Sequence, residues 1–275
     1  MGWRETCTLA SVPNQPRLRV IAGLPAERVT SPGGYSLSGG VVLLIAEDGT
    51  GRLLDLAGEA CALNVSATAI VECALGADID KTCSGVAARF KVETGQVRSD
   101  IETLLSGLVR RGMMTSQAHT SRRCFGAPAV QRTIAPALAV CALAPHRALT
   151  VKAWVLLAVA FFAIRLFGWP RTAEAWLQAA AHRRTDAGHD DGAAITSIER
   201  AVASAIACYP VEVSCKERAL CCHLLAGAAG IASRVVLGVD LNPFALHCWC
   251  ECGSRILAER DDGLRNRFIP FMAYS

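Results

Sequence analysis

The sequence lacks an apolar run long enough to cross a bilayer. Its longest unbroken run spans residues 153–164, which is 12 residues, and Lys152 and Arg165 close it at both ends. A membrane-spanning helix needs about 20 such residues. We therefore expect a helix that is buried or docked on a partner protein, and we expect no membrane contact.

An excess of charge of one sign is also missing. The chain has 28 basic and 24 acidic side chains, which are interspersed and leave a net charge of +4. Proteins that bind nucleic acid concentrate Lys and Arg on one face, so this balance argues against a nucleic-acid partner. A phosphate-binding glycine loop is absent as well, and we expect no cofactor.

No secretory signal is seen ahead of the cysteines. There are 13 of them, an odd number, in 275 residues. Disulfide scaffolds are short secreted chains with paired cysteines. We therefore expect a reduced, cytoplasmic protein, and the length predicts two domains.

What the sequence does contain begins with a small α+β unit in residues 35–114. β-prone runs at 41–46 and 52–56 flank a turn that contains Gly49 and Gly51, a pattern that predicts a hairpin. Asn64 or Ser66 is expected to cap a helix that runs to about residue 75, and Asp78 or Asp80 to cap another that ends near residue 90. The clearest helix spans 96–111, where apolar residues recur every three or four positions until Gly112.

The motifs VVLL at 41–44, GRLLDL at 51–56 and LVRRGM at 108–113 resemble the winged-helix-like precursor-recognition element of ribosomal peptide-modifying enzymes, typified by the pyrroloquinoline-quinone peptide chaperone. Winged helices also bind DNA, but the third helix here has mixed charges where a recognition helix is mostly basic. The resemblance implies that a leader peptide adds as a strand at a sheet edge beside the third helix. Carried over by position, the edge is 52–56 and the leader-binding residues are Arg52, Leu53, Leu54, Asp55, Leu56, Val97, Ile101 and Leu105.

The second half is predicted to have helices first and strands later. A polar stretch at 115–133 indicates a linker, and helices are predicted over 135–143, 149–167 and 172–183. A loop at 185–192 gathers three aspartates and His189. A metal site and a solvated turn both fit, and we favour the turn because no rigid element holds a ligand geometry there. The predicted domains are 1–114 for recognition and 134–275 for catalysis, joined by 115–133.

The best candidate for a reactive group is Cys215. It follows Ser214, a good helix cap, so its thiol is expected in the first turn of a helix over 216–226. Free N–H groups and the positive end of the helix dipole favour a thiolate there. His247 follows 32 positions later on a predicted strand, and Glu259 follows 12 positions after that. This order fits thiol acyl transfer, with the backbone N–H of Cys215 as oxyanion donor.

Strand alternation over 244–252 places His247, Trp249 and Glu251 on one face and the cysteines at 248, 250 and 252 on the other. Three cysteines on one face raise the alternative of a zinc site. Structural zinc sites usually pair their ligands through short turns such as C-x-x-C, and a flat strand has none. We interpret these cysteines as core residues and expect no metal.

Four motifs keep one order and spacing: CKERAL at 215–220, GIASRVVLGV at 230–239, PFALHCWCE at 243–251 and RIL at 255–257. Together they resemble the transglutaminase-like leader peptidase, or B protein, of lasso-peptide biosynthesis. The resemblance implies a papain- or transglutaminase-like domain in which Cys215 is the nucleophile, His247 the general base and Glu259 the orienting carboxylate. That family usually has aspartate in the third role. Asp261 is the alternative here, because a three-residue hairpin at 253–255 would place it opposite His247.

The resemblance also implies a pathway. The thiolate attacks a leader-peptide carbonyl, the histidine protonates the departing amine, and water hydrolyses the thioester. An asparagine-synthetase-like cyclase then closes the released core peptide, and that partner binds the ATP. Two other functions remain open: a non-catalytic module that delivers the precursor, and transfer to an amine in place of water.

Overall fold

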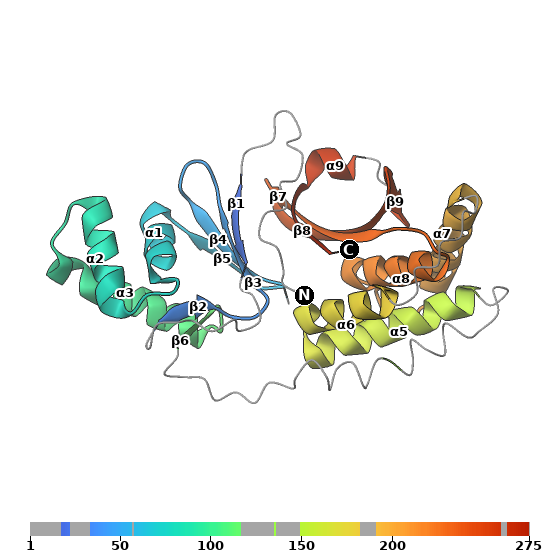
Figure 1. The fold of residues 1–275 in the computed structure, drawn as a ribbon, viewed down its shortest axis with the longest axis horizontal. Helices are drawn as coiled ribbons and strands as arrows, with labels where there is room; N and C mark the ends of the chain where they lie inside the picture. The colour runs from blue at the N-terminus through green and yellow to red at the C-terminus, as the bar shows by residue number, and fades with distance from the viewer. Residues whose placement is uncertain are drawn as a thin grey trace. The chain divides into compact units, whose positions relative to one another are not determined.

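The structure is a computed structural model that describes residues 18–22, 34–56, 58–116, 135, 149–181, 191–259 and 263–274. These residues form two compact units, one within residues 16–124 and one within residues 125–275. Figure 1 colours the first blue to green and the second yellow to red. Each unit combines helices with an antiparallel sheet, so the predicted α+β class is confirmed.

The first unit is built on a four-stranded antiparallel sheet. In sheet order its strands are β1 (Arg19–Ala22), β3 (Val41–Ile45), β4 (Gly51–Asp55) and β5 (Ala60–Leu63). The predicted hairpin is β3–β4. Asp48 stabilises its turn by accepting from the Thr50 N–H at 2.9 Å, and Gly49 supplies a positive φ of 82°. A separate antiparallel pair joins β2 (Tyr35–Leu37) to β6 (Met114–Ser116).

Three helices share one apolar core with this sheet: α1 (Val65–Ala74), α2 (Ile79–Phe90) and α3 (Thr94–Arg110). The side chains of Asn64 and Asp78 cap α1 and α2, as predicted, by accepting from backbone N–H groups three residues later. Gly112, at φ 73°, ends the turn that follows α3. Caps and periodicity therefore located all three helices to within two residues.

The prediction that residues 52–56 form the sheet edge is wrong. β4 pairs with β3 on one side and with β5 on the other. Five of the eight predicted leader-binding residues are also inaccessible, since Leu53, Leu54, Ile101 and Leu105 are 0% exposed and Leu56 is 2% exposed. The error arose at β5, because its Ala-Cys-Ala-Leu sequence has little strand propensity. Within the part of the chain described, the edge strands of this sheet are β1 and β5.

Between residue 149 and the second sheet, the described residues of the second unit form four helices: α5 (Leu149–Phe167), α6 (Trp169–Ala181), α7 (Asp191–Ala207) and α8 (Cys215–Ala228). Helix α8 is central, since it contacts the three other helices and the strands of the second sheet. In Figure 1 it lies between that sheet and the pair α5 and α6. The indole N–H of Trp176 on α6 donates to the Leu220 carbonyl of α8 at 2.8 Å. Helix α7 was not predicted.

Helix α5 has two different faces. Ala153, Leu156, Leu157 and Ala160 are buried against the unit. Apolar side chains also occupy the opposite face, where Phe162 is 60% exposed. With 19 residues and a mean hydropathy of 2.0, α5 is the one described helix that is long and apolar enough to cross a membrane, but length and composition alone are weak evidence. The expected burial therefore holds for one face.

The second sheet has the order β10-β7-β8-β9, formed by β10 (Ile269–Tyr274), β7 (Arg234–Leu241), β8 (Phe244–Cys252) and β9 (Arg255–Leu257), with the short helix α9 (Leu264–Arg267) before β10. Cys252 pairs with Arg255, so the turn between β8 and β9 has two residues, and the predicted three-residue hairpin is wrong. The register that placed Asp261 opposite His247 does not hold for that reason. Asp261 itself lies outside the described residues, as do all but residue 135 of the helix predicted over 135–143 and most of the loop at 185–192.

Candidate active site

The start of α8 is held by a capping box. The Ser214 side chain accepts from the Glu217 N–H at 3.4 Å, and the Glu217 carboxylate accepts from the Ser214 N–H at 2.8 Å. Arg165 of α5 donates to the other Glu217 oxygen at 2.8 Å, and this carboxylate is 2% exposed. The cap predicted from the sequence is confirmed, and it makes Cys215 the first helical residue.

His247 lies on β8 with its ring against two aromatic side chains. The centroid of its ring is 5.2 Å from that of Phe268 and 6.1 Å from that of Trp249, to which it is nearly parallel. Its partner on β7 is Gly238, where an added Cβ would lie 2.6 Å from the Trp249 ring. Glycine at this position therefore leaves room for the tryptophan that supports the histidine.

A buried carboxylate anchors that tryptophan. The indole N–H of Trp249 donates to Glu251 at 2.9 Å, and the same carboxylate pairs with Arg234 at 2.6 Å and with Arg265 at 3.4 Å. Glu251 is only 5% exposed. The predicted alternation along β8 is therefore observed, and the polar face of the strand forms a supporting layer beneath the histidine.

Glu259 reaches the histidine from the segment after β9. Ala258 adopts a left-handed conformation at φ 56°, and Glu259 Oε1 then lies 3.4 Å from His247 Nε2. Because Nε2 is buried without a well-aligned hydrogen bond to any described residue, the contact is an ion pair and not a short hydrogen bond. The same oxygen accepts from Arg218 at 3.1 Å.

The electrostatics of the site favour separated charges. Burial disfavours the Cys215 thiolate, but a side-chain hydrogen bond to His247, the charge of His247 and a backbone hydrogen bond to Cys248 outweigh it and lower the pKa of Cys215. Burial also disfavours the imidazolium, yet contacts with Cys215 and Glu259 raise the pKa of His247 to about 9. The arrangement favours a thiolate–imidazolium pair.

Other cysteines near the site behave differently. Cys222, two turns along α8, is completely buried, and burial raises its pKa to about 12. Burial likewise raises the pKa of Cys248 well above its ordinary value. Cys221 is buried and donates to the Ala153 carbonyl at 3.6 Å. These thiols stay protonated and act as packed core residues, whereas Cys215 is both partly exposed and acidified.

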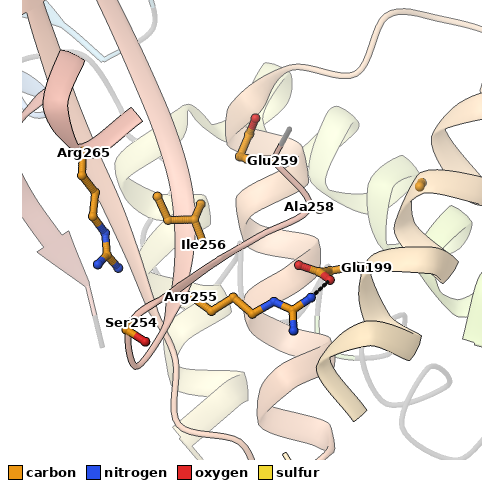
Figure 2. Close-up of a pocket in the computed structure, with 8 residues that line it drawn as sticks. Glu199, Ser254, Arg255, Ile256, Ala258, Glu259 and Arg265 are labelled. Carbon is orange, nitrogen blue, oxygen red and sulfur yellow. Dashed lines mark hydrogen bonds and ion pairs between the residues drawn. The ribbon is translucent and has the colours of Figure 1, made fainter. Parts of the chain in front are cut away.

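A pocket of about 660 Å³ borders the carboxylate of the site. Its lining includes Glu259 and Arg265, and Figure 2 shows Arg255 extending to Glu199, which it contacts at 2.5 Å. Neither the thiol nor the imidazole lines it. The pocket is therefore a neighbour of the reacting groups and not the place where they meet.

Comparison with known families assigns both units. The family model described as transglutaminase-like superfamily matches residues 153–273, and the model of coenzyme PQQ synthesis protein D, PqqD, matches residues 40–114. The chain joins a PqqD domain to a transglutaminase-like domain. This is the architecture of the B proteins that the sequence motifs resembled. Comparison with curated proteins and with solved structures gave no match.

The transglutaminase-like domain brings Cys215, His247 and Glu259 together, as the sequence motifs predicted. Their catalytic roles remain predictions. Sequence reasoning missed the part that Arg218 plays at this site, although its spacing of three residues from Cys215 on a predicted helix signals a shared face. Transglutaminase-like proteins include cysteine peptidases and transferases, and a PqqD domain implies a precursor peptide as binding partner.

Proposed function

We propose that the chain binds the leader of a lasso-peptide precursor through its PqqD domain and cleaves that leader with Cys215, His247 and Glu259. The main support is the contact series from thiol to imidazole to carboxylate inside a transglutaminase-like domain. The PqqD domain supplies the substrate class, since such domains bind precursor peptides. We expect the reaction to take place in the cytoplasm, where the precursor and ATP are both present.

The proposed reaction is hydrolysis through a thioester. The Cys215 thiolate attacks a leader carbonyl carbon, and the backbone N–H at the helix start donates to the oxyanion. The His247 imidazolium gives its proton to the departing amine, which frees the N-terminus of the core peptide. His247 then takes a proton from water as the water attacks the thioester, so the leader leaves as a carboxylate and the thiol is restored. Glu259 stabilises the imidazolium throughout.

We assign the leader-binding edge to β5 instead of β4, because β4 lies inside the sheet. The Asp55 N–H donates to the Glu59 carbonyl at 2.8 Å, and hydrogen-bonded pairs alternate along an antiparallel ladder. The backbone groups of Cys61 therefore face β4, while those of Ala60 and Ala62 face the open edge. Arg111, just after α3, contacts the Cys61 sulfur at 3.4 Å, which places the end of α3 at this edge. A leader strand would add to β5 beside α3.

The product defines the partner that must follow. A core peptide with a free amine needs an activated carboxyl group before an amide can form, and activation consumes ATP. We propose that an asparagine-synthetase-like cyclase binds the ATP and closes the ring, while the present chain needs no cofactor.

The deciding experiment is precursor cleavage by the Cys215→Ala variant of the full chain, followed by mass spectrometry. We expect cleavage to fall to background while leader binding persists, and we expect Cys208→Ala, at an exposed cysteine, to cleave normally. Cleavage by Cys215→Ala would contradict the proposal and favour a delivery module. A leader product carrying an added amine would assign the alternative transfer reaction.

A further inference from the structure

We propose that Arg218 is a positioning residue that holds the Glu259 carboxylate against His247. This inference rests on the proposed function, because it concerns the same reacting groups. Arg218 Nη1 lies 3.1 Å from Glu259 Oε1, and that same oxygen lies 3.4 Å from His247 Nε2. One oxygen is thus shared by the arginine and the histidine.

The burial of Arg218 distinguishes it from other paired arginines. Its side chain is 25% exposed, whereas the eight other arginines in ion pairs within the described residues are 42–63% exposed. Its Nε is buried without a hydrogen-bond partner in the part of the chain described. Burying an arginine with a donor unsatisfied costs stability, so a stability role alone explains the residue poorly.

The chain topology gives Arg218 a reason to be where it is. The three reacting groups come from three elements: Cys215 from α8, His247 from β8, and Glu259 from the segment after β9. Residues three apart on a helix share a face, so Arg218 lies one turn beyond Cys215 on the same rigid helix. The arginine therefore ties the acid to the element that carries the nucleophile.

A glutamate depends on the contact with Arg218 more than an aspartate at the same position would. Its additional methylene adds a rotatable bond, and fixing that bond costs conformational entropy. The ion pair with Nε2 is long, at 3.4 Å, and gives little directional hold by itself. A second contact to the same oxygen restricts the carboxylate to the positions from which it can stabilise the imidazolium.

The test is the pKa of His247, measured by NMR in the full-length, inactive Cys215→Ala background, where no precursor is needed. The charged group that contacts the imidazole is then Glu259, with Arg218 bound to the same carboxylate oxygen and Lys216 near the thiol position. Removing a cation raises the pKa of a neighbouring histidine through space. Releasing Glu259 lowers it. We expect the release of Glu259 to outweigh the lost cation, so Arg218→Gln should lower the pKa of His247, and it should raise that pKa slightly instead when Glu259→Gln is also present.

Kinetics supply the second readout. With the thiol intact, Arg218→Gln should lower kcat for precursor cleavage on the order of 10- to 100-fold with little change in KM, and Arg218→Lys should recover part of the loss. An unchanged or raised pKa of His247 in the Arg218→Gln variant would overturn the positioning role. If Arg218→Gln fails to fold, Arg218→Lys carries the same comparison. If the proposed cleavage does not occur, the comparison of the intact chain with Cys215→Ala shows it. The titration of His247 can still be interpreted, because it needs no precursor.

Discussion

The two units place their polar groups in opposite ways. In the described part of the PqqD domain, the buried polar side chains are those of two threonines, Thr68 and Thr82. Each hydroxyl donates a hydrogen bond to the backbone carbonyl four residues earlier, at the start of its own helix. In the transglutaminase-like domain, Glu217 and Glu251 are 2% and 4% exposed and are held by arginines. A domain that binds a peptide through a strand edge needs a plain apolar core beneath that edge. A domain that separates charges in a reaction needs oriented, desolvated charges.

The largest expected effect comes from removing a buried charge of the second unit. Glu251→Ala leaves Trp249 and Arg234 without their acceptor, and we expect a loss of about 3 kcal/mol in the free energy of unfolding. Urea unfolding followed by tryptophan fluorescence measures it, because Trp154, Trp169, Trp176 and Trp249 lie in this unit and residues 16–124 contain no tryptophan. A loss below about 1 kcal/mol would show that this acid is no more important than a surface pair.

Gly238→Ala tests the packing beneath the histidine. The new Cβ would meet the Trp249 ring at 2.6 Å, so we expect a loss of about 2 kcal/mol and slower cleavage as His247 is displaced. Gly107→Ala in α3 is the matched change in the first unit, where a Cβ meets open space. We expect it to be neutral or to stabilise that helix slightly. Equal losses in the two variants, by hydrogen exchange, would contradict the packing argument.

Sequence reasoning performed differently on these two regions, for physical reasons. In the PqqD domain the helices were found because caps such as Asn64 and Asp78 act locally, but the edge strand of the sheet was missed because β5 is short and alanine-rich. An edge is a property of the whole sheet, and a single strand does not reveal it.

In the transglutaminase-like domain the sequence motifs indicated three residues that the structure brings together, Cys215, His247 and Glu259, while several elements were not predicted. Helix α7 and strand β10 carry none of the motifs, and the aspartate that begins helix α7, Asp191, was assigned to the loop at 185–192. The two-residue turn before β9 was also misjudged, although Glu259 still reaches His247 through the left-handed Ala258. Contacts between distant segments, such as Arg218 with Glu259, have no local signature.

Glu259→Gln tests the contribution of the Glu259 charge through the pH dependence of cleavage. The pKa of Cys215 is lowered and that of His247 is raised to about 9, so kcat/KM should rise as the thiol ionises and fall as the imidazolium deprotonates near pH 9. Removing the carboxylate removes one cause of the raised value. We expect the descending limb to move to lower pH and the maximum to drop on the order of 10- to 100-fold. Glu199→Gln, another acid of the pocket, should leave the limb in place.

Ala62→Pro tests the open edge of the first unit. Proline deletes an N–H that faces outward from β5, so the internal ladder stays intact. We expect the affinity for the leader to fall about tenfold, which corresponds to the loss of roughly one main-chain hydrogen bond. The cleavage of short substrates that lack the segment bound by β5 should be unchanged. Ala62→Val keeps the N–H and should bind normally. Binding that survives the proline would move the leader site away from β5.

The smallest effect is expected at a surface pair of the first unit. Arg98 contacts Asp80 and Glu102, and these three side chains are 43%, 75% and 54% exposed. Water already solvates such charges, so Arg98→Ala should leave the stability of the PqqD domain almost unchanged. Hydrogen exchange of peptides from α2 and α3 across a urea series measures it. A loss approaching that of Glu251→Ala would mean that the first unit also depends on its charges, and the contrast between an apolar binding domain and a charged catalytic one would fail.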